Sequence, residues 1–150
     1  AGVTNRFGTI EDGTTSSDYR SDEISRKISI GASLLQFEWK NHKINLLDLP
    51  GYADFAGEMR CGLRVTDLAV VLVNGVNGVE VGTDSAVDLL DELNIPRMFF
   101  INLLDREHAK FDEALDTIKE AYGNNTAMLR QNYGKHNHNL SLVIIISYFL

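Results

Sequence analysis

Two short motifs carry side chains suited to binding a nucleotide, and each follows an extended apolar run. The first is Asp48-Leu49-Pro50-Gly51, which leads into a helix start near Asp54. A carboxylate in that place can hold a Mg²⁺-bound water, while the fixed φ of Pro50 and the bare Cα of Gly51 let a backbone N–H approach a phosphate. An ordinary turn is the alternative interpretation, because D-x-P-G by itself also occurs by chance.

The second motif is Asn102-Leu103-Leu104-Asp105. An Asp carboxylate can accept hydrogen bonds from two adjacent N–H donors on the edge of guanine, a pair that adenine lacks, so Asp105 could select the base. Asn102 could brace the loop. N-x-x-D alone is common in chains of this length, so a plain loop is the alternative, and only the place at a strand end favours binding.

A polar, glycine-containing segment over residues 11–29 lies upstream. A mobile loop is one interpretation of it. The hydroxyl of Ser29 could instead ligate Mg²⁺ and close the segment over a γ-phosphate, as loops that order on ligand binding do. The phosphate-cradling motif G-x-x-x-x-G-K-[ST] does not occur in the sequence, because the one Gly-Lys pair, Gly134-Lys135, lacks both the first glycine and the hydroxyl.

The elements that would position these residues alternate in type. Residues 35–39 and 43–48 are extended runs joined by a polar turn at 40–42, and this pattern predicts an antiparallel hairpin. The uninterrupted apolar runs Leu68–Val73 and Met98–Ile101 predict strands buried on both faces, as in a parallel sheet.

Apolar residues at helical spacing surround these runs. They predict helices over Asp54–Arg64, around Ala86–Leu93 and over Phe111–Tyr122, with Gly123 as the stop of the last one. Strands that alternate with helices indicate an α/β fold, here a doubly wound, mostly parallel sheet with one antiparallel hairpin. Ligands of such sheets bind beyond the carboxyl ends of the strands, where both motifs fall.

The composition limits the class of protein further. With 150 residues, of which 44% are hydrophobic and 23% charged, the chain has the size and make-up of one globular domain. Its net charge of -7 argues against a nucleic-acid-binding surface over the whole chain. The longest apolar run, Leu140–Leu150, is far shorter than the ~20 residues of a membrane-spanning helix. The lone Cys61 forms no internal disulfide, which favours the reducing cytosol.

Some further expectations concern packing and the end of the chain. Cys61 and Trp39 are expected in the core, because small thiols and large aromatic rings are most often buried. Residues 124–139 are rich in Asn and are expected to form a loop, and residues 140–150 a strand or a short buried segment.

Taken together, the motifs resemble the GTPase domain of bacterial translation elongation factor G over about residues 3–123. The residues that carry the resemblance, in order and spacing, are Asp12–Thr15, Arg26–Ile30, Glu38-Trp39, His42–Phe55, Gly78–Thr83 and Asn102–Glu107. A weaker likeness to the start of a subdomain inserted in that domain continues through Gly134-Lys135 and Asn139–Ile146.

The resemblance implies roles for the first group of residues. Residues 12–29 would be the switch I segment, with Ser29 in place of the family's Mg²⁺-binding Thr. Residues 48–51 would be the switch II motif, where the family usually has Thr instead of Leu49. The Asp48 carboxylate would serve Mg²⁺, and the Gly51 N–H would meet the γ-phosphate of GTP. Tyr52 takes the place of a His that positions the attacking water, and a phenol with a pKa of about 10 supplies no imidazole charge there.

The resemblance also implies that Asn102 and Asp105 read guanine, with Leu103 in place of the family's Lys. The fold would be a P-loop GTPase-like G domain lacking its first strand and P-loop, which precede Ala1 in the family, as the last guanine motif follows Leu150. Residues 1–123 would form the partial G domain, and 124–150 a loop and the start of an inserted subdomain or a tail unlike the native one.

The expected function is that of a fragment of an elongation factor G-like protein, whose intact parent would hydrolyse GTP on the ribosome during translocation. GTP and Mg²⁺ are the implied ligands, bound weakly or not at all by these residues alone, which are expected to be inactive. We expect a monomeric cytoplasmic protein with the ribosome as partner of the parent, and neither DNA nor membrane binding. The alternative is a nucleotide-free α/β interaction module, which Tyr52, Leu103 and the missing P-loop favour for the isolated chain.

Overall fold

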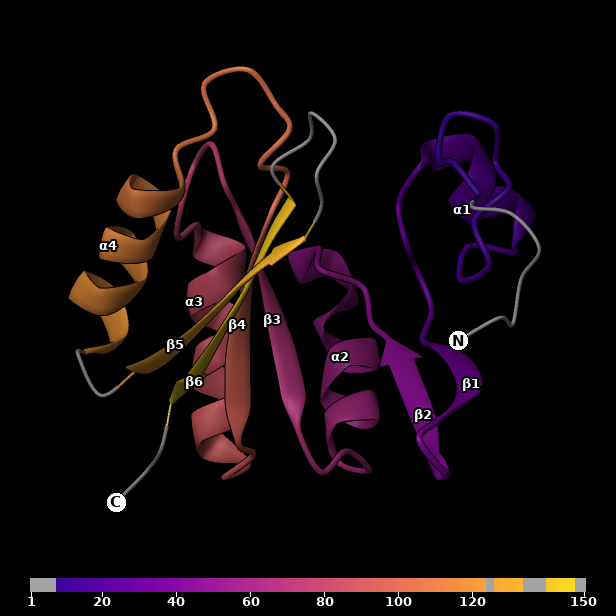
Figure 1. Ribbon diagram of the computed structural model, residues 1–150. Helices are drawn as coiled ribbons and strands as arrows, with labels where there is room; N and C mark the ends of the chain where they lie inside the picture. Colours follow the sequence, from indigo (N-terminus) through magenta and orange to yellow (C-terminus); the bar gives the residue numbers. More distant parts are fainter. Residues whose placement is uncertain (1–7, 124–125, 134–139, 148–150) are drawn as a thin grey trace. The chain divides into compact units, whose positions relative to one another are not determined.

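The computed structural model describes residues 8–123, 126–133 and 140–147, the last two ranges by their backbone (Figure 1). The chain divides into two compact units, Ala1–Thr66 and Asp67–Leu150. Each unit positions one of the two motifs, so each is described by itself.

The first unit contains a helix, a hairpin and a second helical segment. Its elements are α1 (Ser21–Arg26), β1 (Ser33–Trp39), β2 (His42–Asp48), the short 3₁₀ helix η1 (Ala53–Phe55) and α2 (Ala56–Leu63). The expected hairpin is confirmed: β1 and β2 pair antiparallel from Ser33 opposite Asp48 to Trp39 opposite His42. Lys40 and Asn41 both have positive φ, 47° and 63°, as the two-residue turn of a twisted hairpin requires.

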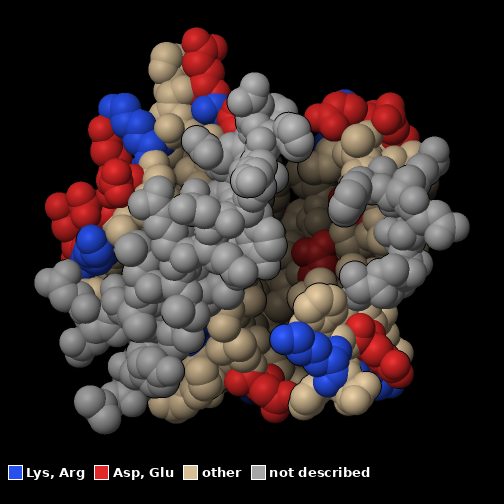
Figure 2. Space-filling model, in the orientation of Figure 1, with Lys and Arg blue, Asp and Glu red and all other residues tan. Residues whose placement is uncertain are grey.

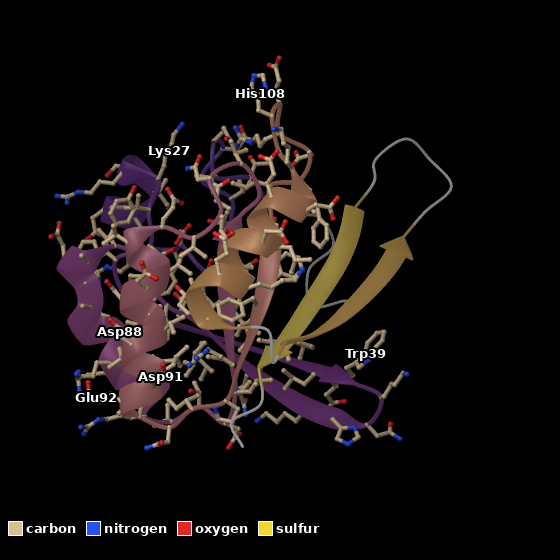
Figure 3. The ribbon with its side chains drawn as sticks, turned by 90° about the vertical axis from the view of Figure 1, so that its left-hand side faces the viewer. Lys27, Trp39, Asp88, Asp91, Glu92 and His108 are labelled. Atoms are coloured by element: carbon tan, nitrogen blue, oxygen red, sulfur yellow. The ribbon has the colours of Figure 1, made fainter. Side chains whose placement is uncertain are left out.

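Two packing expectations in this unit are wrong. Trp39 is 57% exposed, because it is the last residue of β1 at the turn end of the hairpin, where its ring extends away from the strand pair (Figure 3). Cys61 is exposed as well, since α2 buries the neighbouring Gly62 and Leu63 instead. In both places the residue type favours burial, but the element presents that position to solvent.

The second unit is a four-stranded sheet with two helices. Its elements are β3 (Ala69–Asn74), α3 (Val81–Glu92), β4 (Arg97–Asn102), α4 (Phe111–Tyr122), β5 (Thr126–Tyr133) and β6 (Leu140–Ser147), with the strand order β3-β4-β6-β5. The α/β class and the parallel pair are confirmed, because β3 and β4 run parallel with α3 between them. The pairings of β4 with β6 and of β6 with β5 are antiparallel.

The core of this unit lies between the sheet and the two helices. Phe99 of β4 is fully buried and stacks on Tyr122 of α4, with ring centroids 5.2 Å apart and planes 7° from parallel. The Tyr122 hydroxyl donates to the Asp84 carboxylate of α3 at 2.6 Å, which joins the two helices. The other buried apolar side chains of this core are Val71, Val73, Val87, Leu90, Ile95, Ile101, Ala114, Leu115 and Ile118.

The expectation that β3 is buried on both faces is wrong. Val71 and Val73 are buried, but the alternate residues Val70 and Leu72 are 50% and 63% exposed. Side chains of a strand alternate between its two faces, and α3 and α4 both cover the face that carries Val71. Within the described residues β3 is also an edge strand of its sheet.

The expectation of a loop over residues 124–139 is also wrong in part. Residues 126–133 form β5, which pairs with β6 from Thr126 opposite Ser147 to Tyr133 opposite Leu140. Ladder hydrogen bonds to a partner strand override the turn preference of an Asn-rich segment. The strand expected within residues 140–150 is confirmed as β6, while Gly134-Lys135 lies outside the described residues. The domain boundary at residue 123 stays a prediction.

The described outer surfaces of α3 and α4 are rich in carboxylates. Exposed carboxylates follow α4 at Asp112, Glu113, Asp116 and Glu120 (Figure 2), and α3 carries Asp88, Asp91 and Glu92 on its outer side (Figure 3). In the part of the chain that the structure describes, no helix has the length and apolar character needed to cross a bilayer.

Candidate nucleotide site

Asp48 and the segment that contains Ser29 are linked through one end of the hairpin. Asp48 is the last residue of β2 and lies opposite Ser33, the first residue of β1. Because Ser29 precedes Ser33 by four residues, the strand pairing keeps the Ser29 segment at the end of the hairpin where Asp48 lies. The backbone N–H of Ala32 donates to Glu58 Oε2 of α2 at 3.2 Å, which attaches this segment to the helix after the Asp48 motif.

The Ser29 hydroxyl is held by an upstream carboxylate. Ser29 Oγ donates to Asp18 Oδ1 at 2.8 Å, and Thr15 Oγ1 donates to Asp18 Oδ2 at 3.3 Å. Ser33 Oγ in turn donates to the Ser17 carbonyl at 2.6 Å. Ser29 and Asp18 are both half-buried, so the bond joins two parts of the loop that are eleven residues apart in sequence.

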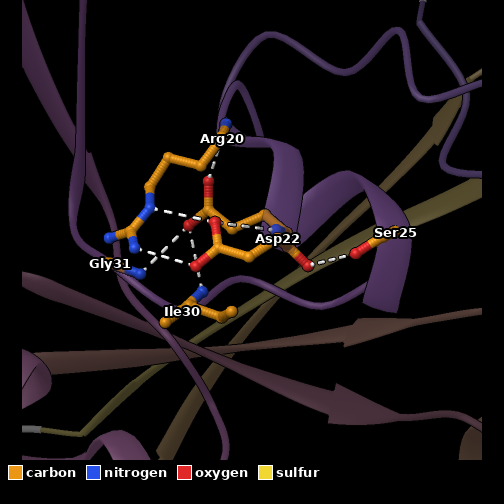
Figure 4. Close-up of polar contacts among 6 residues, drawn as sticks. Arg20, Asp22, Ser25, Ile30 and Gly31 are labelled. Atoms are coloured by element: carbon orange, nitrogen blue, oxygen red, sulfur yellow. Dashed lines mark hydrogen bonds and ion pairs between the residues drawn. The ribbon is translucent and has the colours of Figure 1, made fainter.

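Glu23 is the buried centre of this loop, although sequence reasoning did not single it out. Its side chain is 1% exposed and accepts three backbone N–H groups, from Arg20 at 3.2 Å and from Ile30 and Gly31 at 3.0 Å each (Figure 4). Burial raises the pKa of the Glu23 carboxyl, but the three donors outweigh it and leave the pKa below its usual range. A glutamate at the third position of a short helix was the available sequence signal.

Gly51 and Tyr52 follow Asp48 in an open stretch of backbone. Pro50 is fully buried, whereas Gly51 is exposed and a Cβ built on it would meet nothing within 4 Å. Tyr52 is 58% exposed and precedes η1. The Leu49 side chain packs on Gly62 of α2, where a Cβ would lie 2.4 Å from Leu49 Cδ2. Gly51 is therefore an exposed position with open space beside its Cα, next to the packed Leu49.

Asn102 is the last residue of β4 and lies beside Asn74, the last residue of the parallel strand β3. The Gly75 N–H donates to the Asn102 carbonyl at 2.8 Å, and the Gly75 carbonyl accepts from the Lys110 N–H at 2.9 Å. These two bonds hold the loop after β3 against both ends of the loop after β4, which contains Asp105. The carboxyl ends of β3 and β4 therefore lie together at one end of the sheet, as expected for the parallel strands that the sequence predicted.

Asp105 lies in the turn after β4 and its side chain is exposed. The Leu103 just before it has a φ of 60°, in the left-handed region that side-chain-bearing residues seldom adopt, and the Arg106 N–H donates to its carbonyl at 3.1 Å. Next to this turn is a shallow hollow of about 460 Å³, lined by Asn74, Val76, Asn77, Leu103, Arg106 and Glu107. Leu103 thus contributes apolar surface to this hollow, next to the carboxyl end of β4.

Ser29, Asp48 and Gly51 offer groups that suit a magnesium ion bound together with phosphate. They do not form a metal site made of protein ligands alone. Among the residues that the structure describes, no group of three His, Cys, Asp or Glu side chains is placed to hold a metal ion. A hydroxyl, a carboxylate and a backbone N–H are instead the set that Mg²⁺ and a phosphate chain share, because Mg²⁺ is held by one or two protein oxygens plus phosphate oxygens. The convergence of Asp48 and Gly51 with Asn102 and Asp105 stays a prediction.

The parallel strands β3 and β4, with polar residues at their carboxyl ends, and the hairpin that leads into Asp48–Gly51 make this an α/β protein. A family model described as "Elongation factor Tu GTP binding domain" matches residues 2–148. The chain belongs to this family.

Known relatives are much longer than this chain. It is 44% identical over 119 residues to elongation factor G of Granulibacter bethesdensis, a match that covers 79% of this chain and 17% of the relative. It is 40% identical over 120 residues to a mitochondrial ribosome-releasing factor 2 of Scheffersomyces stipitis, covering 80% of this chain and 14% of the relative. A solved protein of Thermus thermophilus matches 87% of this chain and 20% of its own, with a TM-score of 0.78 and 31% identity. The resemblance to elongation factor G that the motifs indicated is confirmed by these matches.

Proposed function

We propose that this chain supplies the Mg²⁺-binding and guanine-reading parts of a GTP site in an elongation factor G-like translation factor. The observation that supports the proposal is the pairing of Asp48 with Ser33, the first residue of β1, which follows Ser29 by four residues. In the proposed site Ser29 and Asp48 hold Mg²⁺, the Gly51 N–H binds the γ-phosphate, and Asn102 and Asp105 read the base.

Each residue would act through a contact that its surroundings permit. The open space beside Gly51 leaves room for a phosphate group to approach the backbone. The exposed phenol of Tyr52 can orient a water molecule, and it carries no positive charge to assist the reaction. Bound GTP and Mg²⁺ would supply the phosphoryl group and the charge neutralisation that hydrolysis requires. The ribosome as partner and the cytoplasm as location belong to the same proposal.

Nuclear magnetic resonance titration of the 150-residue chain tests the proposal, because it detects binding in the millimolar range. Addition of GTP with Mg²⁺ should shift the backbone amide signals of Gly51, Asn102 and Asp105 in a saturable way. ATP with Mg²⁺ at the same concentration is the matched control and should leave the Asp105 signal in place, because adenine lacks the donor pair that Asp105 accepts. Equal shifts of the Asp105 signal with both nucleotides would contradict the guanine-reading role, and no shift with either nucleotide would favour the nucleotide-free interaction module.

A further inference from the structure

We propose that Glu23 is the positioning residue of the segment around Ser29, and that its buried carboxylate fixes the backbone from which the Ser29 hydroxyl is presented. The inference rests on the proposed function for the role of Ser29, but the position of the segment can be measured without a nucleotide.

The Glu23 carboxylate is buried, and its hydrogen-bond partners are backbone N–H groups. It is 1% exposed, and a buried carboxylate is costly unless hydrogen bonds replace the water that it has lost. The guanidinium of Arg20 does not supply them, because it directs Nε and Nη2 to Asp22, at 3.1 and 2.8 Å (Figure 4). The hydrogen bonds that satisfy Glu23 therefore come from main-chain N–H groups.

These bonds fix the residues that follow Ser29. Glu23 Oε1 accepts the N–H groups of Ile30 and Gly31, each at 3.0 Å, and the first of these belongs to the peptide unit that begins at Ser29. Because a peptide unit is planar, fixing two consecutive N–H groups sets the orientation of the backbone at Ser29. Glu23 Oε2 accepts the Arg20 N–H at 3.2 Å, so one side chain joins the start and the end of the segment.

The backbone carbonyl of Glu23, the left-handed conformation of Lys27 and the small size of Gly31 allow the chain to turn back after α1. The Glu23 carbonyl accepts the N–H groups of Lys27, which has a φ of 57°, and of Ile28 at 3.3 Å, and this ends α1. A Cβ on Gly31 would lie 3.3 Å from Arg20 Nη1 and 4.0 Å from Glu23 Oε1, so glycine leaves room for both side chains. The chain thus turns back after α1 and returns Ile30 and Gly31 to the carboxylate seven and eight residues upstream.

Amide hydrogen exchange of the full chain without nucleotide tests the proposal. In the unaltered chain the amides of Ile30 and Gly31 should be protected. Glu23→Gln removes the charge that strengthens the bonds to Ile30 and Gly31 and places an NH₂ donor against the Arg20 N–H, so it should lower that protection by roughly ten- to a hundredfold, while amides of β1 and β2 keep theirs. Glu38→Gln, which removes the same charge from an exposed position of β1, is the matched control and should change neither. The Cβ resonance of Ser29 should shift in Glu23→Gln and stay in place in Glu38→Gln.

Unchanged exchange at Ile30 and Gly31 in a folded Glu23→Gln chain would overturn the proposal. If that variant does not fold, Glu23→Asp replaces it, because a carboxylate one methylene shorter keeps the charge but cannot reach both ends of the segment. Its protection at Ile30 and Gly31 should fall by roughly tenfold or more, and full retention would overturn the proposal. Loss of protection in the variants combined with no response of the unaltered chain to GTP and Mg²⁺ would support the role of Glu23 and contradict the proposed function.

Discussion

Ser29 donates its hydroxyl hydrogen to the Asp18 carboxylate at 2.8 Å, across eleven residues of sequence. A hydroxyl has one hydrogen and two lone pairs, so this bond uses the hydrogen and leaves the oxygen lone pairs for another partner. A cation needs those lone pairs. The Asp18 contact is therefore compatible with the Mg²⁺ role proposed for Ser29, and it sets the direction in which the lone pairs point.

Asp18→Ala should weaken the Mg²⁺ dependence of GTP binding. Without its acceptor the Ser29 hydroxyl rotates freely, and the loss of one hydrogen bond to a partly exposed carboxylate corresponds to about 1 kcal/mol, or roughly fivefold. The measurement is a Mg²⁺ titration of the Gly51 amide shift at fixed GTP. Glu11→Ala removes a charge from the same loop at an exposed position and should leave the titration midpoint unchanged. Equal midpoints for both variants would contradict the role of Asp18.

Asp105→Asn should change which base the chain prefers. The amide places a donor opposite one of the two guanine donors, so GTP binding should weaken by about 1.5–3 kcal/mol, roughly ten- to a hundredfold. Xanthosine triphosphate carries a carbonyl in place of the exocyclic amine and should gain relative affinity. Parallel titrations with the two nucleotides measure the preference. If a folded Asp105→Asn chain kept the original preference, the carboxylate would serve only the turn in which it lies.

Two glycines of α2 should respond oppositely to alanine. At Gly57 a Cβ meets nothing within 4 Å, so Gly57→Ala should leave stability unchanged or raise it by up to about 1 kcal/mol. At Gly62 a Cβ would lie 2.4 Å from Leu49 Cδ2, and Gly62→Ala should cost about 1–3 kcal/mol. Urea unfolding measures both. Adding Leu49→Ala to Gly62→Ala removes the collision, so the two changes should be less destabilising together than their sum.

Tyr122→Phe should lower stability by about 1 kcal/mol, because it removes the hydrogen bond to Asp84 and keeps the stack on Phe99. The loss of unfolding free energy caused by Tyr122→Phe should also depend on pH. Burial, and then the Asp84 carboxylate, raise the pKa of Tyr122 above its ordinary value of 10.0. A raised pKa in the folded state gives a stabilisation that is complete below about pH 10 and is lost as the pH rises through the folded value.

Urea unfolding between about pH 7 and pH 11 measures this dependence, in the unaltered chain and in Tyr122→Phe. The difference in unfolding free energy between them should be constant up to about pH 9 and shrink above about pH 10. A difference that stayed constant over the whole range would show that the Tyr122 phenol is not held in its neutral form.

The sequence by itself determined the local elements and the order of the motifs. The hairpin of residues 33–48 follows from alternating polarity and a polar turn, and α4 follows from apolar residues at helical spacing that end at Gly123. Asn102 could be placed at a strand end from the buried run before it. These features depend on neighbours within a few residues, and a periodic pattern records such neighbours directly.

The tertiary structure decided what periodicity cannot record. Glu23 is polar and lies in a short helix, and only the return of the chain through Lys27 brings Ile30 and Gly31 to its carboxylate. Whether Val70 and Leu72 are covered depends on which face of β3 the helices take, and the strand β5 forms because β6 offers it a partner. Burial, partner choice and the satisfaction of a buried charge are set by contacts between distant residues, and those contacts exist only once the chain has folded.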